Sequence, residues 1–127
     1  MDGAYNCITL EGESQNIQIV QSNKNGIEQF VIDRLEFEAD GKWKHSKSEQ
    51  DGLEVYSDVR GLCEGREMFQ ADELTKIYYQ GDFVLNLHSI SKFYPKEDGG
   101  LAVEFGGFVE DSQGKSPIDK LYTCKPI

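Results

Sequence analysis

The sequence predicts a mainly β protein, either an antiparallel sandwich or a partly open barrel of about eight strands. Short segments alternate apolar and polar residues, the period of two that puts successive side chains on opposite faces of a strand. Glycine-containing turn sequences separate these segments, as at Asn25-Gly26, Asp40-Gly41 and Asp51-Gly52. With 127 residues and 38% hydrophobic content, the chain has the size and composition of one globular domain, residues 1–127.

The stretch Gly81–Val109 predicts the central hairpin. Apolar side chains recur at every second position in both halves, at Phe83, Leu85 and Leu87 and again at Leu101, Val103 and Phe105. The link of residues 95–100 contains a proline and a glycine pair, which suits an antiparallel connection. We therefore expect this hairpin at the centre of the core, with Val84, Asn86 and His88 on the face opposite to Phe83.

The N-terminal third predicts a β-meander. Residues 4–10 and 17–21 are strand-like and flank a polar turn, and Asn25-Gly26 marks the next turn. Residues 27–38 fit a helical face as well as a strand; a strand is favoured over 30–38, and 27–30 stays open. A three-residue loop ending at a left-handed Gly41 would pair the strands on either side. That hairpin would place Phe37 opposite Trp43 and Leu35 opposite His45.

The middle of the chain predicts an edge strand, an amphipathic strand and one short helix. Residues 43–48 are polar, which suits a sheet edge. In residues 53–59, Leu53, Val55 and Val59 are expected to face inward and Glu54, Tyr56 and Asp58 outward. Glycines in 61–65 then break this strand.

Residues 72–80 favour a helix that Asp72 caps and Gly81 ends, which would make the fold α+β. The alternative is a strand over 75–79. After the central hairpin, residues 110–117 are expected to form a loop and residues 119–125 the last strand.

Composition narrows the classes of partner. Thirteen basic against 23 acidic residues give a net charge of −10 and a pI near 4.6. Nucleic-acid binding needs a basic surface, and anionic membranes attract basic proteins, so we expect neither partner. A basic protein partner is compatible with this charge. No apolar run reaches the length of a membrane helix, and the first residues lack the pattern of a signal peptide, which is absent or already removed; we expect a cytoplasmic protein.

The three cysteines form no CxxC pair and no metal-binding spacing. We expect free, mostly buried thiols in a reducing compartment, with a Cys7–Cys124 disulfide as the alternative if the terminal strands pair. Nucleotide-binding, nucleophile-elbow and zinc-protease motifs are all absent. We therefore predict no catalytic residue, no metal site and no cofactor, and a protein that is not an enzyme.

Acidic and aromatic residues in 36–60 give the candidate binding surface. If residues 30–60 form a three-stranded meander, their outward carboxylates share one face. Tyrosine and tryptophan bury much area with few rotatable bonds and make good anchors. The predicted partner-binding residues are Glu36, Glu38, Glu54 and Asp58 for electrostatic steering and Trp43 and Tyr56 as anchors. The preferred function is a small acidic inhibitor that occludes a basic protein, as toxin-immunity and anti-defence proteins do.

Two other functions remain open. A small-ligand-binding barrel or sandwich would have an enclosed apolar cavity lined by Phe83, Leu85, Phe105 and Tyr122. A small hydrolase-like enzyme would hold His88 beside a buried carboxylate. The sequence is compatible with a monomer or with a homodimer formed through an edge strand.

Overall fold

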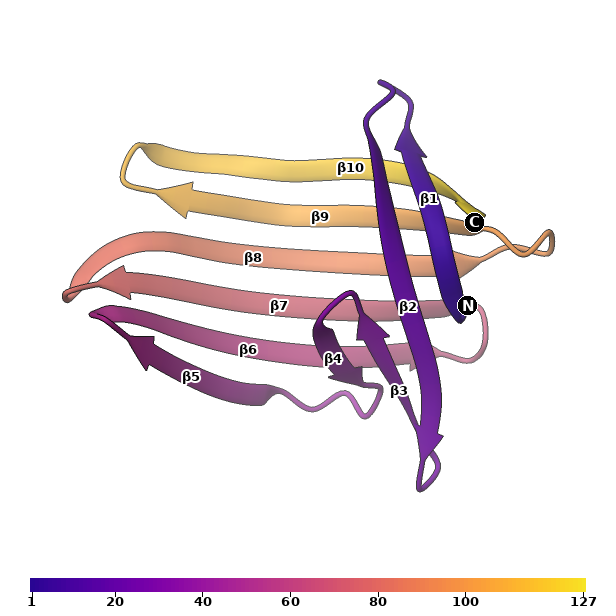
Figure 1. Ribbon diagram of the computed structural model, residues 1–127, viewed down its shortest axis with the longest axis horizontal. Helices are drawn as coiled ribbons and strands as arrows, with labels where there is room; N and C mark the ends of the chain where they lie inside the picture. The colour runs from indigo at the N-terminus through magenta and orange to yellow at the C-terminus, as the bar shows by residue number, and fades with distance from the viewer.

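The computed structural model describes residues 1–127 and consists of ten strands without any helix (Figure 1). The strands are β1 (Gly3–Thr9), β2 (Ser14–Lys24), β3 (Ile27–Ile32), β4 (Leu35–Glu38), β5 (Lys44–Gln50), β6 (Leu53–Glu64), β7 (Met68–Tyr79), β8 (Asp82–Pro95), β9 (Leu101–Asp111) and β10 (Gly114–Pro126). The predicted mainly β class is confirmed, with ten strands where about eight were expected. Nothing in the fold is a helix long and apolar enough to cross a membrane.

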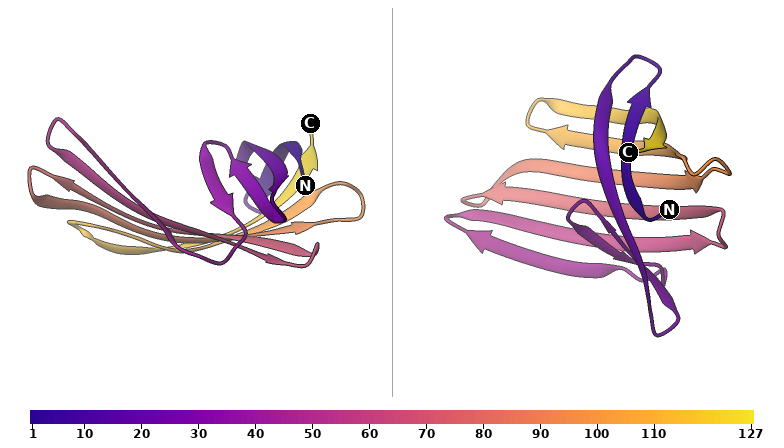
Figure 2. Two further views of the ribbon diagram at one scale, coloured as in Figure 1. Left: turned by 90° about the horizontal axis from the view of Figure 1, so that it is seen from below. Right: turned by 45° about the vertical axis from the view of Figure 1, so that its right-hand side comes forward.

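All ten strands belong to one antiparallel sheet in the order β4-β3-β2-β1-β10-β9-β8-β7-β6-β5. The sheet curls into a half-barrel, so that β1–β4 cross over one end of the long strands (Figures 1 and 2). We call β1–β4 the cover and β5–β10 the main sheet. The inner face of the main sheet is the one that carries the cover, and the outer face is the opposite one.

The core lies only where the cover meets the main sheet. Phe30 of the cover stacks on Phe69 of β7 with 3.8 Å between ring centroids, and Phe37 and Phe93 contact the same ring. Full burial of one such side chain contributes about 1.5–3 kcal/mol. Only one half of the central hairpin belongs to this core. Phe93, at the loop end of the hairpin, is 4% exposed, whereas Phe83, at the other end, is 40% exposed.

A disulfide fastens the corner where the cover joins the main sheet. Cys7 of β1 lies directly opposite Cys124 of β10, and the two form a bond across 117 positions of sequence. The expectation of free thiols is therefore wrong for this pair, and the alternative disulfide is correct. The reason is that the terminal strands pair in antiparallel register, and only the exposed Cys63 remains free.

The Asp40-Gly41 sequence is not a hairpin, contrary to prediction. Gly41 is left-handed at φ +71°, but β4 and β5 lie at opposite ends of the sheet order. Phe37 pairs with Phe30 instead of Trp43, because its ring is buried against Phe69. The backbone of β4 approaches β6 closely at Gly61, where a Cβ atom would lie 2.7 Å from the Glu38 carbonyl oxygen.

Side-chain contacts hold the connection between β4 and β5. Lys44 Nζ lies 2.6 Å from an Asp40 carboxylate oxygen, and the Lys42 amide donates to the same carboxyl group. These hydrogen bonds, that of Lys44 above all, lower the pKa of Asp40. The segment 27–38 also differs from the expected single strand over 30–38, because a turn at 33–34, with Asp33 at φ +56°, divides it into β3 and β4.

Residues 72–80 are strand and not helix. The apolar residues of this segment fit both periods, but pairing with β6 and β8 on either side decides the outcome. Asp72 does not cap a helix: its side chain is buried and accepts hydrogen bonds from Arg60 and Gln70. Ladder pairing also carries β6 past Gly61 to Glu64 and starts β10 at Gly114, where a break and a loop were expected.

Beyond the cover, the main sheet extends as a single layer that we call the wing (residues 44–59, 73–89 and 107–118), as Figure 2 shows. Its inner face carries aliphatic side chains over which no element lies, among them Val55, Ile77, Leu85, Leu87 and Val109. β5 forms the free edge, and every residue in it is exposed, so the polar edge strand predicted for 43–48 is present. Charged residues there discourage further strand pairing.

Candidate functional site: an aromatic groove on the outer face

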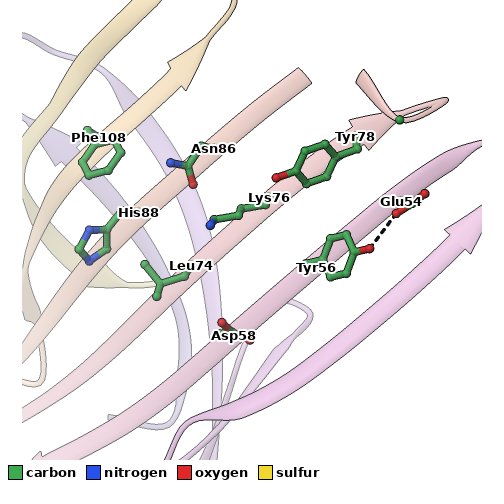
Figure 3. A pocket seen from close by; sticks show the side chains of 10 residues that line it. Glu54, Tyr56, Asp58, Leu74, Lys76, Tyr78, Asn86, His88 and Phe108 are labelled. Carbon is green, nitrogen blue, oxygen red and sulfur yellow. Dashed lines mark hydrogen bonds between the residues drawn. The ribbon is translucent and has the colours of Figure 1, made fainter. Parts of the chain in front are cut away.

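A groove of about 650 Å³ lies on the outer face of the wing (Figure 3). Strands β6, β7, β8 and β9 supply its walls and floor, and the β7–β8 turn closes one end. Its lining residues are Glu54, Tyr56, Asp58, Leu74, Lys76, Tyr78, Gly81, Asn86, His88 and Phe108. They share one face because paired residues in an antiparallel ladder point the same way, as Leu74 and His88 do, and His88 and Phe108.

Three aromatic rings form a continuous row at one side of the groove. Tyr56 and Tyr78 meet edge to face with 5.9 Å between ring centroids, and Tyr78 meets Phe83 in the same way at 6.3 Å. A register shift after Ile77 places Phe83 opposite Tyr78. Phe83 therefore lies on the outer face with Asn86 and His88, whereas simple alternation predicted it on the opposite face. Edge-to-face pairs contribute about 0.5–1.5 kcal/mol beyond their buried area.

Ammonium groups of the protein lie over two aromatic rings of the groove, Tyr56 and Phe108. Lys47 Nζ is 5.2 Å from the centroid of Tyr56, and Lys115 Nζ is 3.9 Å from that of Phe108. The pKa of Lys47 is raised, mainly by the adjacent Tyr56 hydroxyl and less by Glu49 and Glu54. An aromatic face attracts a cation through the negative charge above its ring. Lysines of the protein itself therefore lie over aromatic rings on both sides of the groove.

Carboxylates stand on either side of Tyr56 along β6. The Tyr56 hydroxyl donates to Glu54 Oε2 at 2.7 Å, which fixes the ring and the carboxylate together. Asp58 lies 2.5 Å from His45 Nδ1 on the edge strand. Lys76 and Asn86 lie between this wall and the His88–Phe108 pair. The groove therefore combines two carboxylates, one ammonium and an amide with aromatic surface.

The structure brings together only part of the predicted binding set. Glu54, Tyr56 and Asp58 line the groove. Trp43 lies on the same outer face, next to the groove, with its ring 4.5 Å from the Arg60 guanidinium. Glu36 and Glu38 are in β4 of the cover, where Glu38 is 3.8 Å from Lys44. The three-stranded meander that would have joined all four carboxylates does not form, because β4 and β5 are not neighbours.

Sequence reasoning missed the other half of the groove. Leu74, Lys76 and Tyr78 lay in the expected helix, so their side chains were not placed on a sheet face. Alternation along residues 84–88 did place Asn86 and His88 on the same face of their strand. Two polar side chains on one face were the sequence signal that could have indicated the groove. Phe108 could be located only through the pairing of β8 with β9.

The pairing of His88 with a buried carboxylate, which the hydrolase-like alternative requires, is not seen in the structure. Its ring packs edge-on against Phe108 at 5.4 Å. The buried carboxylate on the neighbouring strand, Asp72, is bound by Arg60 at 2.6 Å and by Gln70 at 2.9 Å. No group of three or more histidine, cysteine, aspartate or glutamate side chains is arranged to hold a metal ion. The one histidine–carboxylate contact at the groove is that of Asp58 with His45 on the edge strand.

The four residues expected to line an apolar ligand cavity are also separated. Phe105 and Tyr122 line a cavity on the inner face under the cover. Leu85 lies further along the inner face, and Phe83 is on the outer face. The inner-face cavity therefore has a different lining from the one expected.

Comparison with known proteins finds no matching family model, no similar curated protein and no similar solved structure. The function must therefore be inferred from the chemistry of the chain itself.

Proposed function

We propose that the protein is a non-catalytic binding protein whose outer groove holds a basic segment of a partner protein and thereby occludes it. The observation that carries this proposal is the Tyr56–Tyr78 pair, flanked by Glu54 and Asp58, with an ammonium of the protein already over Tyr56. An arginine or lysine side chain of a partner would meet the same combination of aromatic face and carboxylate. Arginine suits the site better, because its planar guanidinium stacks on rings and binds carboxylates with two donors.

The partner's cation would replace Lys47. Lys47 stands on the free edge strand, where its side chain is half-exposed and its contact with Glu49 is long, at 3.8 Å. Displacing it therefore loses little, since exposed ion pairs contribute at most about 1 kcal/mol. Lys76 and Asn86 on the floor can then donate to the carbonyl groups of the bound segment.

Long-range attraction comes from the whole molecule and not from the groove alone. The net charge of −10 favours approach of a basic partner and speeds association at low ionic strength. The groove itself carries two carboxylates and one ammonium, so local contacts decide where the partner binds. The net charge would therefore steer the partner, and the groove would anchor it. An inhibitor of the toxin-immunity or anti-defence type would use both roles.

The disulfide bears on where such an interaction takes place. Structural disulfides are typical of oxidising compartments and rare in the reducing cytosol. The Cys7–Cys124 bond therefore favours a protein that acts outside the cytosol, in place of the cytoplasmic location expected from the sequence.

A binding experiment with matched charge variants tests the proposal. The probe is a labelled peptide of alternating arginine and glycine, with glutamate replacing arginine in the control peptide, and binding is followed by fluorescence anisotropy. The variant E54Q/D58N removes two carboxylates from the groove, and E36Q/E38Q removes two from the cover, so both change the net charge from −10 to −8. We expect the groove variant to weaken binding about tenfold and the cover variant about twofold at most.

A second pair of variants separates the aromatic contact from charge. Tyr78→Leu removes a ring of β7 from the groove. Tyr94→Leu removes a ring of β8 that is also on the outer face but lies at the covered end. Only the first should weaken binding. Equal losses from the two double variants would show that net charge alone attracts the peptide and would overturn the groove assignment. Binding of a neutral oligosaccharide in preference to the arginine peptide would overturn the class of partner.

A further inference from the structure

A second cavity lies on the opposite face of the main sheet from the groove, under the edge of the cover. Its volume is about 330 Å³, within the lower range of small-molecule sites. Seven of its eleven lining residues are hydrophobic. β1, β2, the end of β3 and the β3–β4 turn supply one wall, and β8, β9 and β10 supply the other.

The walls of this cavity include several of the most deeply buried side chains of the molecule. Cys7 is fully buried and bonded to Cys124, and Phe93 and Val103 are 4% and 7% exposed. Ile17 and Ile32 approach from the cover. Close-packed interiors resist collapse, so a cavity between these elements is preformed and does not need a conformational change to open.

Polar groups are few in this lining. Ser91 contributes a hydroxyl from the main sheet, and Gln15, opposite Cys7 in the β1–β2 ladder, contributes an amide from the cover. The two charged lining residues are already engaged. Lys120 Nζ lies 2.7 Å from Glu13, and Asp33 accepts a hydrogen bond from the Gln18 amide.

We propose that this cavity binds a compact amphipathic small molecule, with its apolar body between cover and sheet and an uncharged polar group on Ser91 and Gln15. An apolar body suits the seven hydrophobic walls, because burying apolar surface drives binding into such a site. An uncharged end group suits the polar lining, because Ser91 and Gln15 can hydrogen-bond to it, whereas a charged group would compete with the Lys120–Glu13 and Asp33–Gln18 contacts for a counter-charge. The site is independent of the outer groove, since the two lie on opposite faces.

A series of probes with one body and three end groups tests the proposal. Octan-1-ol, octanoate and octylammonium share an alkyl chain and differ in charge, and calorimetry measures their binding to the intact disulfide-bonded protein. We expect the alcohol to bind and each charged probe to bind at least about fivefold more weakly. The strongest binding by octanoate or by octylammonium would overturn the choice of an uncharged group.

Variants locate the probe within the molecule. Ser91→Ala should weaken octan-1-ol binding about fivefold through loss of one hydrogen bond, whereas Ser116→Ala, on the inner face of the wing, should leave it unchanged. Ile32→Trp should fill the cavity and abolish binding, and Lys92→Trp adds the same ring to the outer face as its control. Circular dichroism confirms that each variant is folded. Unchanged binding in folded Ser91→Ala and Ile32→Trp proteins would show that the alcohol binds elsewhere and would overturn the site.

Discussion

The covered end and the wing are built from the same five long strands, β6–β10, but they differ in what stabilises them. At the covered end, Phe69 is 1% exposed and contacts three other aromatic rings. In the wing, the same strand β7 carries Ile77 and Tyr78 on opposite faces with no second layer on either side. Stability is therefore concentrated at one end, and the other end keeps both faces available for contacts. Binding surfaces commonly occupy such regions of low local stability next to a rigid scaffold.

The sharpest contrast between the two ends is the effect of truncating one apolar side chain of β7. Phe69→Ala should lower the free energy of unfolding by about 3–5 kcal/mol, because it removes the ring at the centre of the core. Ile77→Ala, eight residues along the same face, should lower it by about 1 kcal/mol, because its side chain is not covered. Urea denaturation of both variants measures the difference. Equal losses would mean that the wing has a hidden packing partner, such as a second copy of the chain.

The disulfide should account for the next largest effect. Replacing Cys7 and Cys124 together by alanine removes a link across 117 positions, and we expect a loss of about 2–5 kcal/mol in the free energy of unfolding. A reducing agent should produce the same loss in the unmodified protein and no further loss in the double variant. Cys63→Ala serves as the matched control, since that thiol is exposed and unbonded. An unchanged midpoint on reduction would contradict the role of this bond in holding cover and sheet together.

The smallest expected effect concerns the internal cation of the groove. Lys47→Ala frees the Tyr56 ring, so affinity for the arginine peptide should rise about twofold. Lys92→Ala changes the net charge equally from the outer face of the covered end and is the control. A comparable rise in both variants would assign the effect to net charge. A fall in affinity specific to Lys47→Ala would mean that Lys47 takes part in binding.

The parts of the fold that local sequence determines could be predicted. The central hairpin, with its Pro95–Gly100 link, and the Asn25-Gly26 turn depend on neighbouring residues and are present as expected. The helix predicted for residues 72–80 was wrong, because Leu74, Ile77 and Tyr78 satisfy both a helical and a strand period. Only pairing with distant strands, together with the buried Arg60–Asp72 contact, selects the strand.

The strand order and most of the candidate site could not be predicted, because they depend on contacts between residues far apart in the sequence and not on the residues of the turns. Gly41 has the predicted left-handed conformation, but burial of Phe37 under Phe30 and Phe69 directs β4 away from β5. The prediction that Glu54, Tyr56 and Asp58 face outward on β6 was correct, because alternation along one strand is a local property. The rest of the groove comes from β7, β8 and β9, whose order and register are long-range properties of the sheet.

The most direct test of the central claim is a nuclear magnetic resonance titration of the labelled protein with the arginine–glycine peptide, following every backbone amide. We predict that the largest shifts fall on the outer-face wing strands, at Tyr56, Lys76, Tyr78 and His88, and that Glu36 and Glu38 of the cover hardly move. Shifts centred on the cover, or spread evenly over acidic residues throughout the chain, would contradict the assignment of binding to the aromatic groove.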